Sequence, residues 1–244
     1  MVAQRNIYFY KMNLFYAPDI AAPYYQLTEE ESKHLIRVFR YKTGDEVFFT
    51  DGKGYIYTCT IIDDSPKHCK VEVLLKAAGS DKRPFTLQMG VAPTKNISRF
   101  EWYLEKATEI GIETIIPFVS FHSERKEIKT DRLNRVITAA VKQSLKSFHP
   151  QLHGMMKFKE MIALPFDGQK FIAYIDKEVT LELSKAYQPG SNAFVLIGPE
   201  GDFSPEEVEM AKQHGFIPVR LGPSRLRTET AAVAACHTIN LFNY

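Results

Sequence analysis

Two glycine-bearing loops near the C-terminal end constrain the fold of this chain more than any other feature. An apolar run at residues 194–197 has the length and composition of a buried strand. Gly-Pro-Glu-Gly follows at residues 198–201 and is typical of a turn. We expect a helix directly after this turn, because Ser204 suits an N-cap, Pro205 suits the first helical position and Glu207 completes a capping box.

The same strand–loop–helix pattern then occurs a second time. Gly215 is expected to end the first helix, a strand is expected over residues 216–221, and a loop at residues 222–228 leads to a final helix from about Thr230. In open α/β sheets, loops that leave strands and enter helices are where ligands bind. On the pattern alone, two ordinary strand–helix turns remain the alternative interpretation.

The rest of the second half also alternates strands with helices. Strands are expected at residues 85–91, 114–119 and 171–175. One helix is expected from a capping box at residues 98–101 to Gly111, and another from about Asp131. This alternation predicts an α/β domain at residues 85–244, with a mostly parallel sheet covered on both faces.

The first part of the chain predicts a small β-rich domain, residues 1–77, with one helix. A capping box at residues 28–31 opens the helix, whose apolar positions are Leu35, Val38 and Phe39. A hairpin is expected over residues 46–63, and a further strand at 71–75 suggests a small barrel. Residues 77–84 have linker composition, so we place the domain boundary there.

Composition excludes several classes of protein. Hydrophobic residues make up 45% and charged residues 25%, which is ordinary for a soluble globular protein, and no apolar run is long enough for a membrane span. The three cysteines are widely spaced and fit a reducing, cytoplasmic location. They lack zinc-finger spacing, so we expect no metal site. We expect the natural start at Met12, with an extension before it.

Local charge is more informative than the net charge of +2. Between His122 and Pro150 there are seven lysines and arginines against three acidic residues. In the helix after Asp131 the basic residues are expected on the outer face, where they could neutralise phosphates. An ordinary solvated helix face is the alternative.

The two loops together resemble one enzyme class. Gly-Pro-Glu-Gly, followed about twenty residues later by Leu-Gly-Pro-Ser-Arg-Leu-Arg-Thr-Glu-Thr-Ala, resembles the SPOUT class of RNA methyltransferases, and within it the bacterial 16S ribosomal RNA (uracil-N3)-methyltransferases. Further matches lie at Lys95, residues 106–111 and residues 123–125. Two positions depart from the family pattern: Asp202 replaces a glycine, and Ser224-Arg225 replaces an arginine followed by an aliphatic residue.

The resemblance implies a fold, a cofactor and partners. It implies an N-terminal PUA-like β-barrel that binds RNA and a C-terminal SPOUT domain with a trefoil knot. It further implies a homodimer that uses S-adenosylmethionine on the 16S ribosomal RNA of the small subunit. Backbone groups of the two loops hold the cofactor in this family. The residues implied here are Leu196, Ile197, Gly198, Pro199, Glu200, Gly201, Leu221, Gly222, Leu226, Arg227 and Thr228.

Methylation at N3 sets the chemical requirements. The imide N–H must lose its proton, and the negative charge that develops on O2 and O4 must be stabilised. Arg227 is our candidate for charge stabilisation, Glu200 and Glu229 are candidate proton acceptors, and Arg125 is a candidate active-site cation. An Arg227–Glu229 pair that only shapes the loop is the alternative. The candidate RNA contacts are Arg37, Arg40, Lys95, Lys106, Arg125, Lys142 and Lys146.

Two other functions stay open. An RNA-binding ribosome-assembly factor of the same fold, without catalysis, would explain the changes at Asp202 and Ser224. A small-molecule nucleotide-binding enzyme would leave the basic segment and the N-terminal domain unexplained.

Overall fold

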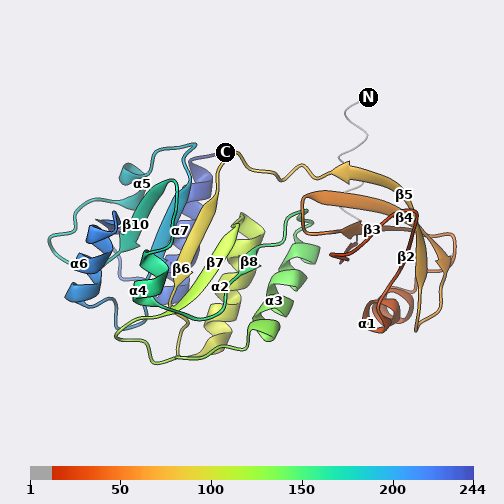
Figure 1. The fold of residues 1–244 in the computed structure, drawn as a ribbon, viewed down its shortest axis with the longest axis horizontal. Helices are drawn as coiled ribbons and strands as arrows, with labels where there is room; N and C mark the ends of the chain where they lie inside the picture. Colours follow the sequence, from red (N-terminus) through yellow and green to blue (C-terminus); the bar gives the residue numbers. More distant parts are fainter. Residues whose placement is uncertain (1–12) are drawn as a thin grey trace. The chain divides into compact units, whose positions relative to one another are not determined.

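The computed structural model describes residues 13–244, so the predicted start at Met12 lies outside the described residues. Contacts divide the chain into two compact units. The first contains the chain up to Lys82 and also Val141–His149, and the second contains Arg83–Ala140 and Pro150–Tyr244. Figure 1 shows the strands and helices of each unit.

The first unit is built on a five-stranded sheet. Its order is β1 (Leu14–Tyr16), β3 (Glu46–Thr50), β4 (Tyr55–Asp63), β5 (Lys70–Ala78) and β2 (Tyr24–Gln26). The predicted hairpin is the antiparallel pair β3–β4, whereas β1 runs parallel to β3. Within residues 13–244, β1 and β2 are the two edges of this sheet. The small β-domain predicted here is confirmed.

The helix of the first unit differs from the prediction. Thr28 caps α1 (Glu29–Lys33), but the chain then widens into a π-helical turn, η2 (His34–Val38), in which the Phe39 amide donates to the His34 carbonyl at 3.1 Å. Leu35 is fully buried as expected, whereas Val38 is 65% exposed. A 3.6-residue period predicted a buried Val38, and the wider turn moves this side chain off the apolar face.

The second unit contains a seven-stranded sheet in which every pair is parallel. The order is β12 (Ile217–Val219), β10 (Gln169–Ala173), β11 (Ala193–Ile197), β6 (Leu87–Val91), β7 (Thr114–Val119) and β8 (Gln151–Leu152), with β9 (Met156–Lys157) also on β7. This confirms the predicted parallel α/β sheet. The trefoil knot stays a prediction from the resemblance.

Helices cover both faces of this sheet, as predicted. The remaining helices are α2 (Ile97–Ile110), α3 (Thr130–Gln143), α4 (Phe158–Ile162), α5 (Leu183–Ala186), α6 (Pro205–Gln213) and α7 (Thr228–Leu241). Buried side chains of α4 and α6 pack on one face, while α2 and α7 pack together and α7 contacts β6 and β11. The helix α6 begins after Ser204 with the predicted capping box. The predicted capping box at residues 98–101 is wrong, because Asn96 caps α2 by accepting from the Ser98 amide at 3.1 Å.

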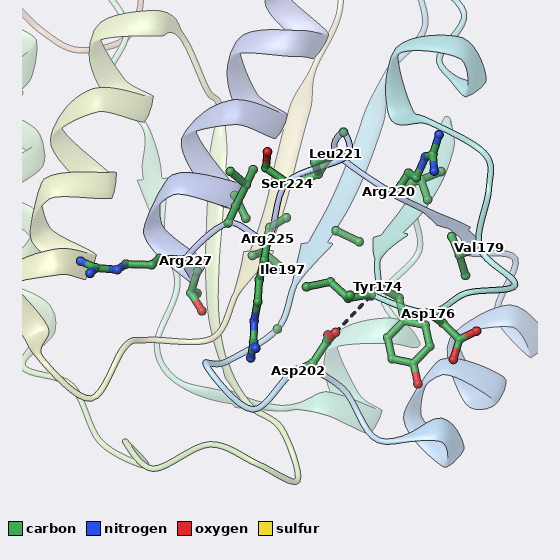
Figure 2. A pocket seen from close by; sticks show the side chains of 18 of the residues that line it. Tyr174, Asp176, Val179, Ile197, Asp202, Arg220, Leu221, Ser224, Arg225 and Arg227 are labelled. Atoms are coloured by element: carbon green, nitrogen blue, oxygen red, sulfur yellow. Dashed lines mark hydrogen bonds between the residues drawn. The ribbon is translucent and has the colours of Figure 1, made fainter.

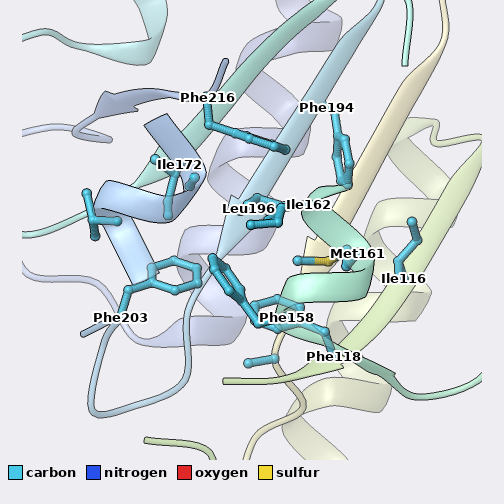
Figure 3. Close-up of a cluster of buried hydrophobic side chains, with 13 residues drawn as sticks. Ile116, Phe118, Phe158, Met161, Ile162, Ile172, Phe194, Leu196, Phe203 and Phe216 are labelled. Atoms are coloured by element: carbon cyan, nitrogen blue, oxygen red, sulfur yellow. The ribbon is translucent and has the colours of Figure 1, made fainter. Parts of the chain in front are cut away.

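An aromatic cluster anchors the loop that follows β11. The Phe203 ring stacks on Phe118 with a centroid distance of 5.9 Å and lies 5.7 Å from the ring of Phe158 (Figure 3). All three are almost completely buried in the same core as Leu196 of β11. Burial of an aromatic ring fixes the position of its backbone, so the turn before Phe203 is attached to the core.

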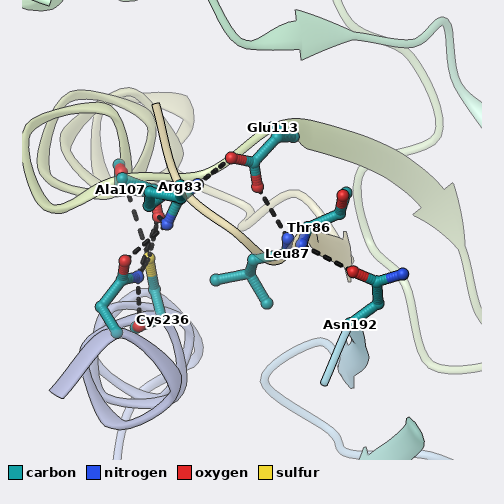
Figure 4. Close-up of polar contacts among 9 residues, drawn as sticks. Arg83, Thr86, Leu87, Ala107, Glu113, Asn192 and Cys236 are labelled. Carbon is teal, nitrogen blue, oxygen red and sulfur yellow. Dashed lines mark hydrogen bonds and ion pairs between the residues drawn. The ribbon is translucent and has the colours of Figure 1, made fainter. Parts of the chain in front are cut away.

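Arg83 joins several elements of the second unit (Figure 4). Its guanidinium donates to the Gly111 carbonyl at 2.9 Å, to the Asn240 side chain and to Glu113. The other carboxylate oxygen of Glu113 accepts from the Leu87 amide at 2.7 Å. Arg83 therefore connects the end of α2, the start of β6 and the C-terminal helix α7.

We predict that Phe203→Ala lowers the free energy of unfolding by about 3–5 kcal/mol, because the buried ring leaves a cavity. Phe121 is 78% exposed, so Phe121→Ala is a matched control that should change stability by no more than about 0.5 kcal/mol. Denaturant unfolding measures both. Equal stability of the two variants would contradict the anchoring role of Phe203.

Candidate active site

A candidate site lies where three parallel strands of the second unit end. In register, Ala173 at the end of β10 lies beside Ile197 at the end of β11 and beside Val219 at the end of β12. The loops that follow these three strands enclose a pocket of about 860 Å³ (Figure 2). Its position at the carboxyl ends of the strands is where open α/β sheets bind ligands, and its size suits a small organic molecule.

The first glycine loop needs its glycines for close packing. A Cβ on Gly198 would lie 3.1 Å from the Phe203 ring, and a Cβ on Gly201 would lie 2.8 Å from the Cβ of His122. Real Cβ atoms do not approach another carbon as closely as 2.8 Å, so the loop at residues 120–123 can lie against Gly201 only because this residue has no side chain.

A buried carboxylate holds that neighbouring loop in place. Glu207 accepts from the Ser120 hydroxyl at 3.0 Å, from the Phe121 amide at 2.9 Å and from the Ser204 amide at 3.0 Å. The predicted capping residue therefore also fixes the loop after β7. The side chains of Phe121 and His122 in this loop are exposed.

The second glycine loop carries Arg225 and Arg227, which both line the pocket. Gly222 has φ of +128°, which side chains rarely adopt, and α7 begins at Thr228, two residues before the predicted start. In Figure 2 the Arg225 side chain extends toward the loop that carries Asp202, whereas Arg227 points away from it toward α2. Within residues 13–244 the Arg227 side chain is exposed and has no hydrogen bond or ion pair.

The third wall of the pocket was not predicted from the sequence. A strand was predicted at residues 171–175, but β10 ends at Ala173, level with β11 and β12, and Ile175 is 66% exposed. Tyr174, Ile175, Asp176, Lys177 and Val179 line the pocket instead. Neighbouring parallel strands end on the same side of a sheet. The predicted strand could therefore have indicated that the loop after it lines the pocket. Burial, with the nearby Asp176 and Asp202, raises the pKa of the Tyr174 phenol.

Asp202, one of the family departures, also lines this pocket. Burial raises the pKa of its carboxyl group. Two backbone amides and the positive charge of Arg225 act in the opposite direction and favour the ionised form.

Glu200 and Arg125 bind the same neighbouring loop. The Glu200 carboxylate accepts from the Lys95 amide at 3.0 Å. The Arg125 guanidinium donates to the carbonyls of Thr94 at 3.0 Å and Lys95 at 2.6 Å. The Lys95 ammonium pairs with Glu124 at 2.7 Å, and this hydrogen bond raises the pKa of Lys95. The Arg125 guanidinium thus contacts backbone carbonyls of the loop between β6 and α2.

Glu229 faces Arg99 of α2 and not Arg225 or Arg227 of the second glycine loop. It is 8% exposed, and one carboxylate oxygen lies 3.8 Å from the Arg99 guanidinium. Its second oxygen is buried without a hydrogen-bond partner in the described part of the chain. No Arg227–Glu229 ion pair occurs among the described residues, so this alternative does not describe the loop.

The structure brings together nearly all residues predicted to hold a cofactor. Leu196 is different: it is fully buried in the core beneath the pocket. The other predicted cofactor-binding residues line the pocket, namely Ile197, Gly198, Pro199, Glu200, Gly201, Leu221, Gly222, Leu226, Arg227 and Thr228. Further residues line the pocket that were not predicted from the sequence, including Arg220, Pro223, Ser224 and Ala231.

The residues predicted to contact RNA are not equivalent. Lys106 lies between Glu105 at 2.7 Å and Glu109 at 2.9 Å, and Lys142 pairs with Glu31 at 3.2 Å. Lys142 and Lys146 were expected on the outer face of one helix, but α3 ends at Gln143 and both are only partly exposed. Arg37 and Arg40 are exposed in the first unit and have no ion pair among the described residues.

Two features are absent from residues 13–244. No helix there is long and apolar enough to cross a membrane. No group of three or more histidine, cysteine or acidic side chains there is placed to hold a metal ion.

Comparison with known proteins gives consistent matches. The family model described as RNA methyltransferase domain matches residues 81–240, and the one described as RNA methyltransferase PUA domain matches residues 27–74. The ribosomal RNA small subunit methyltransferase E of Aquifex aeolicus is 29% identical over 233 residues, covering 91% of this chain and 96% of that protein.

Solved structures agree with this assignment. A probable rRNA-methyltransferase from Porphyromonas gingivalis is 40% identical with a TM-score of 0.89, covering 95% of this chain and 98% of that one. A ribosomal RNA small subunit methyltransferase E from Neisseria gonorrhoeae, bound to S-adenosyl methionine, has a TM-score of 0.86 over 95% of this chain and 98% of that one, at 24% identity, and shows the same fold. The chain belongs to the RNA methyltransferase family, with a PUA domain before the methyltransferase domain.

Proposed function

We propose that this protein transfers the methyl group of S-adenosylmethionine to N3 of a uridine in the 16S ribosomal RNA of the small subunit. The observation that carries the proposal is the pocket formed by two glycine loops at the carboxyl ends of β11 and β12. Relatives over almost the whole chain are named ribosomal RNA small subunit methyltransferase E. Specificity for N3 rests on the resemblance of the loop sequences.

The pocket suits S-adenosylmethionine in chemistry as well as in size. Ile197, Val219, Leu221 and Leu226 provide apolar surface for an adenine ring. Loop backbone at Gly198 and Gly222 offers polar groups without side chains in the way. When bound, the sulfonium group of the cofactor supplies an electrophilic methyl group.

The charged residues around the pocket have different proposed roles. Arg227 stabilises the negative charge that develops on the uracil oxygens, because its guanidinium is exposed and unpaired among the described residues. Glu200 is the proton acceptor, since its carboxylate is exposed beside the pocket, whereas Glu229 is buried against Arg99. Arg125 and Lys95 shape the adjoining loop through their backbone and ion-pair contacts.

The target uridine must be accessible on its Watson–Crick edge, which carries N3. We therefore propose that the substrate base is unpaired or extruded from its helix. Arg37 and Arg40 of the PUA domain bind phosphates elsewhere on the same RNA. We also propose a homodimer and a cytoplasmic location, which the resemblance and the three free cysteines support.

We predict different kinetic effects for the two loop arginines. Arg227→Ala should lower kcat by about 100-fold, the loss expected for one charge-stabilising group, with little change in the Kd for S-adenosylmethionine. Arg225→Ala should instead raise that Kd by about tenfold, because this side chain extends along the pocket. Methyl transfer to small subunits that lack the modification gives kcat, and calorimetry gives the Kd.

Unchanged turnover in Arg227→Ala would remove this residue from the mechanism. A wild-type protein that binds S-adenosylmethionine but methylates no ribosomal RNA would contradict the proposed function and favour the assembly-factor alternative.

We predict that Arg37→Ala weakens RNA binding and reduces the slope of log affinity against log salt concentration by about 1, the effect of one lost phosphate contact. Lys106→Ala should have a smaller effect, because Glu105 and Glu109 already neutralise its charge. Fluorescence anisotropy with a 16S RNA fragment at several salt concentrations measures both. Equal slopes for wild type and Arg37→Ala would show that Arg37 does not contact phosphate.

A further inference from the structure

Asp202 combines a strained backbone with a specific set of contacts. Its φ of +62° lies in the left-handed region, where a non-glycine residue has a conformational cost. The family pattern that the two loops resemble has glycine at this position, and glycine would adopt this conformation freely. A non-glycine side chain in this backbone conformation suggests that the side chain has a function.

The contacts of Asp202 join three loops. Its amide donates to the Pro199 carbonyl at 2.9 Å and closes the turn after β11. One carboxylate oxygen accepts from the Phe203 amide at 2.8 Å, and the other accepts from the Ile175 amide at 3.1 Å (Figure 2). Its carbonyl lies 3.0 Å from Nδ1 of His122 in the loop after β7. Asp202 therefore links the loops after β7, β10 and β11.

The segment after β10 depends on this link. Tyr174 is attached to the sheet by its amide, which donates to the Val219 carbonyl at 3.1 Å. Leu181 is attached at the other end, where its carbonyl accepts from the Arg220 amide at 2.9 Å. Between them, in the described chain, the Ile175–Asp202 bond is the only hydrogen bond from residues 175–180 to any residue outside that segment.

The same segment forms one wall of the candidate cofactor pocket. Ile175, Asp176, Lys177 and Val179 all line it, and their backbone has no regular secondary structure. A wall held at its two ends and by one hydrogen bond between them is expected to open locally more easily than the strands beside it.

We propose that Asp202 is a positioning residue for the cofactor: its carboxylate holds residues 175–179 as the third wall of the pocket and so increases cofactor affinity. The inference rests on the proposed function, because it assumes that S-adenosylmethionine occupies this pocket. The carboxylate acts through the loop and takes no part in methyl transfer.

Asp202→Gly tests the proposal most directly, because glycine keeps the left-handed backbone and removes both side-chain hydrogen bonds. We expect the Kd for S-adenosylmethionine to rise about tenfold and the Ile175 amide to exchange faster with deuterium in the free protein. Asp202→Asn should have an intermediate effect, since the amide NH₂ cannot accept a hydrogen bond. The kcat at saturating substrates should stay within about threefold of wild type.

Asp167→Asn is the control for charge, because Asp167 is exposed near the start of β10, at the opposite edge of the sheet. Asp167→Asn should leave the Kd for S-adenosylmethionine and the exchange rate of the Ile175 amide unchanged. Wild-type affinity and wild-type exchange in Asp202→Gly would overturn the proposal, as would a large loss of kcat with unchanged Kd. A wild-type protein that does not bind S-adenosylmethionine would refute the proposed function instead. Exchange of the Ile175 amide would then still show whether the carboxylate holds the segment.

Discussion

The parallel register of β10, β11 and β12 is the constraint on which the candidate site depends. Because these strands end level with one another, the three loops that leave them meet over the same edge of the sheet. Residues separated by more than fifty positions in the sequence, such as Tyr174 and Arg227, thereby line one pocket. The glycines allow the loops to pack closely, and the side chains that remain decide what the pocket can bind.

The core of the second unit gives these loops a fixed base. Phe203 attaches the first glycine loop to the aromatic cluster, and Glu207 attaches the loop after β7 to the start of α6. Pre-positioned polar groups stabilise developing charge better than groups that must reorganise. The same short sequence, from Gly198 to Glu207, thus contributes a turn, a core anchor, a helix cap and pocket-lining groups.

The elements with local signals could be predicted from the sequence. Ser204, Pro205 and Glu207 indicated the start of α6 correctly, because capping is determined by neighbouring residues. Arg83, by contrast, contacts the ends of distant elements, and no local pattern predicts that. The third pocket wall was missed because Ile175 continues an apolar strand pattern, although the sheet ends two residues earlier. The direction of the Arg225 and Arg227 side chains also depends on the path of the loop, which residue identity alone does not give.

We propose above all that a methyl group is transferred from S-adenosylmethionine in this pocket to N3 of a ribosomal uridine. The most direct measurement incubates the purified protein and the cofactor with small ribosomal subunits that lack the modification, followed by mass spectrometry of the nucleosides. We expect 3-methyluridine, formed only when both cofactor and protein are present. A methyl group on another atom or base, or no methylated nucleoside despite cofactor binding, would contradict it.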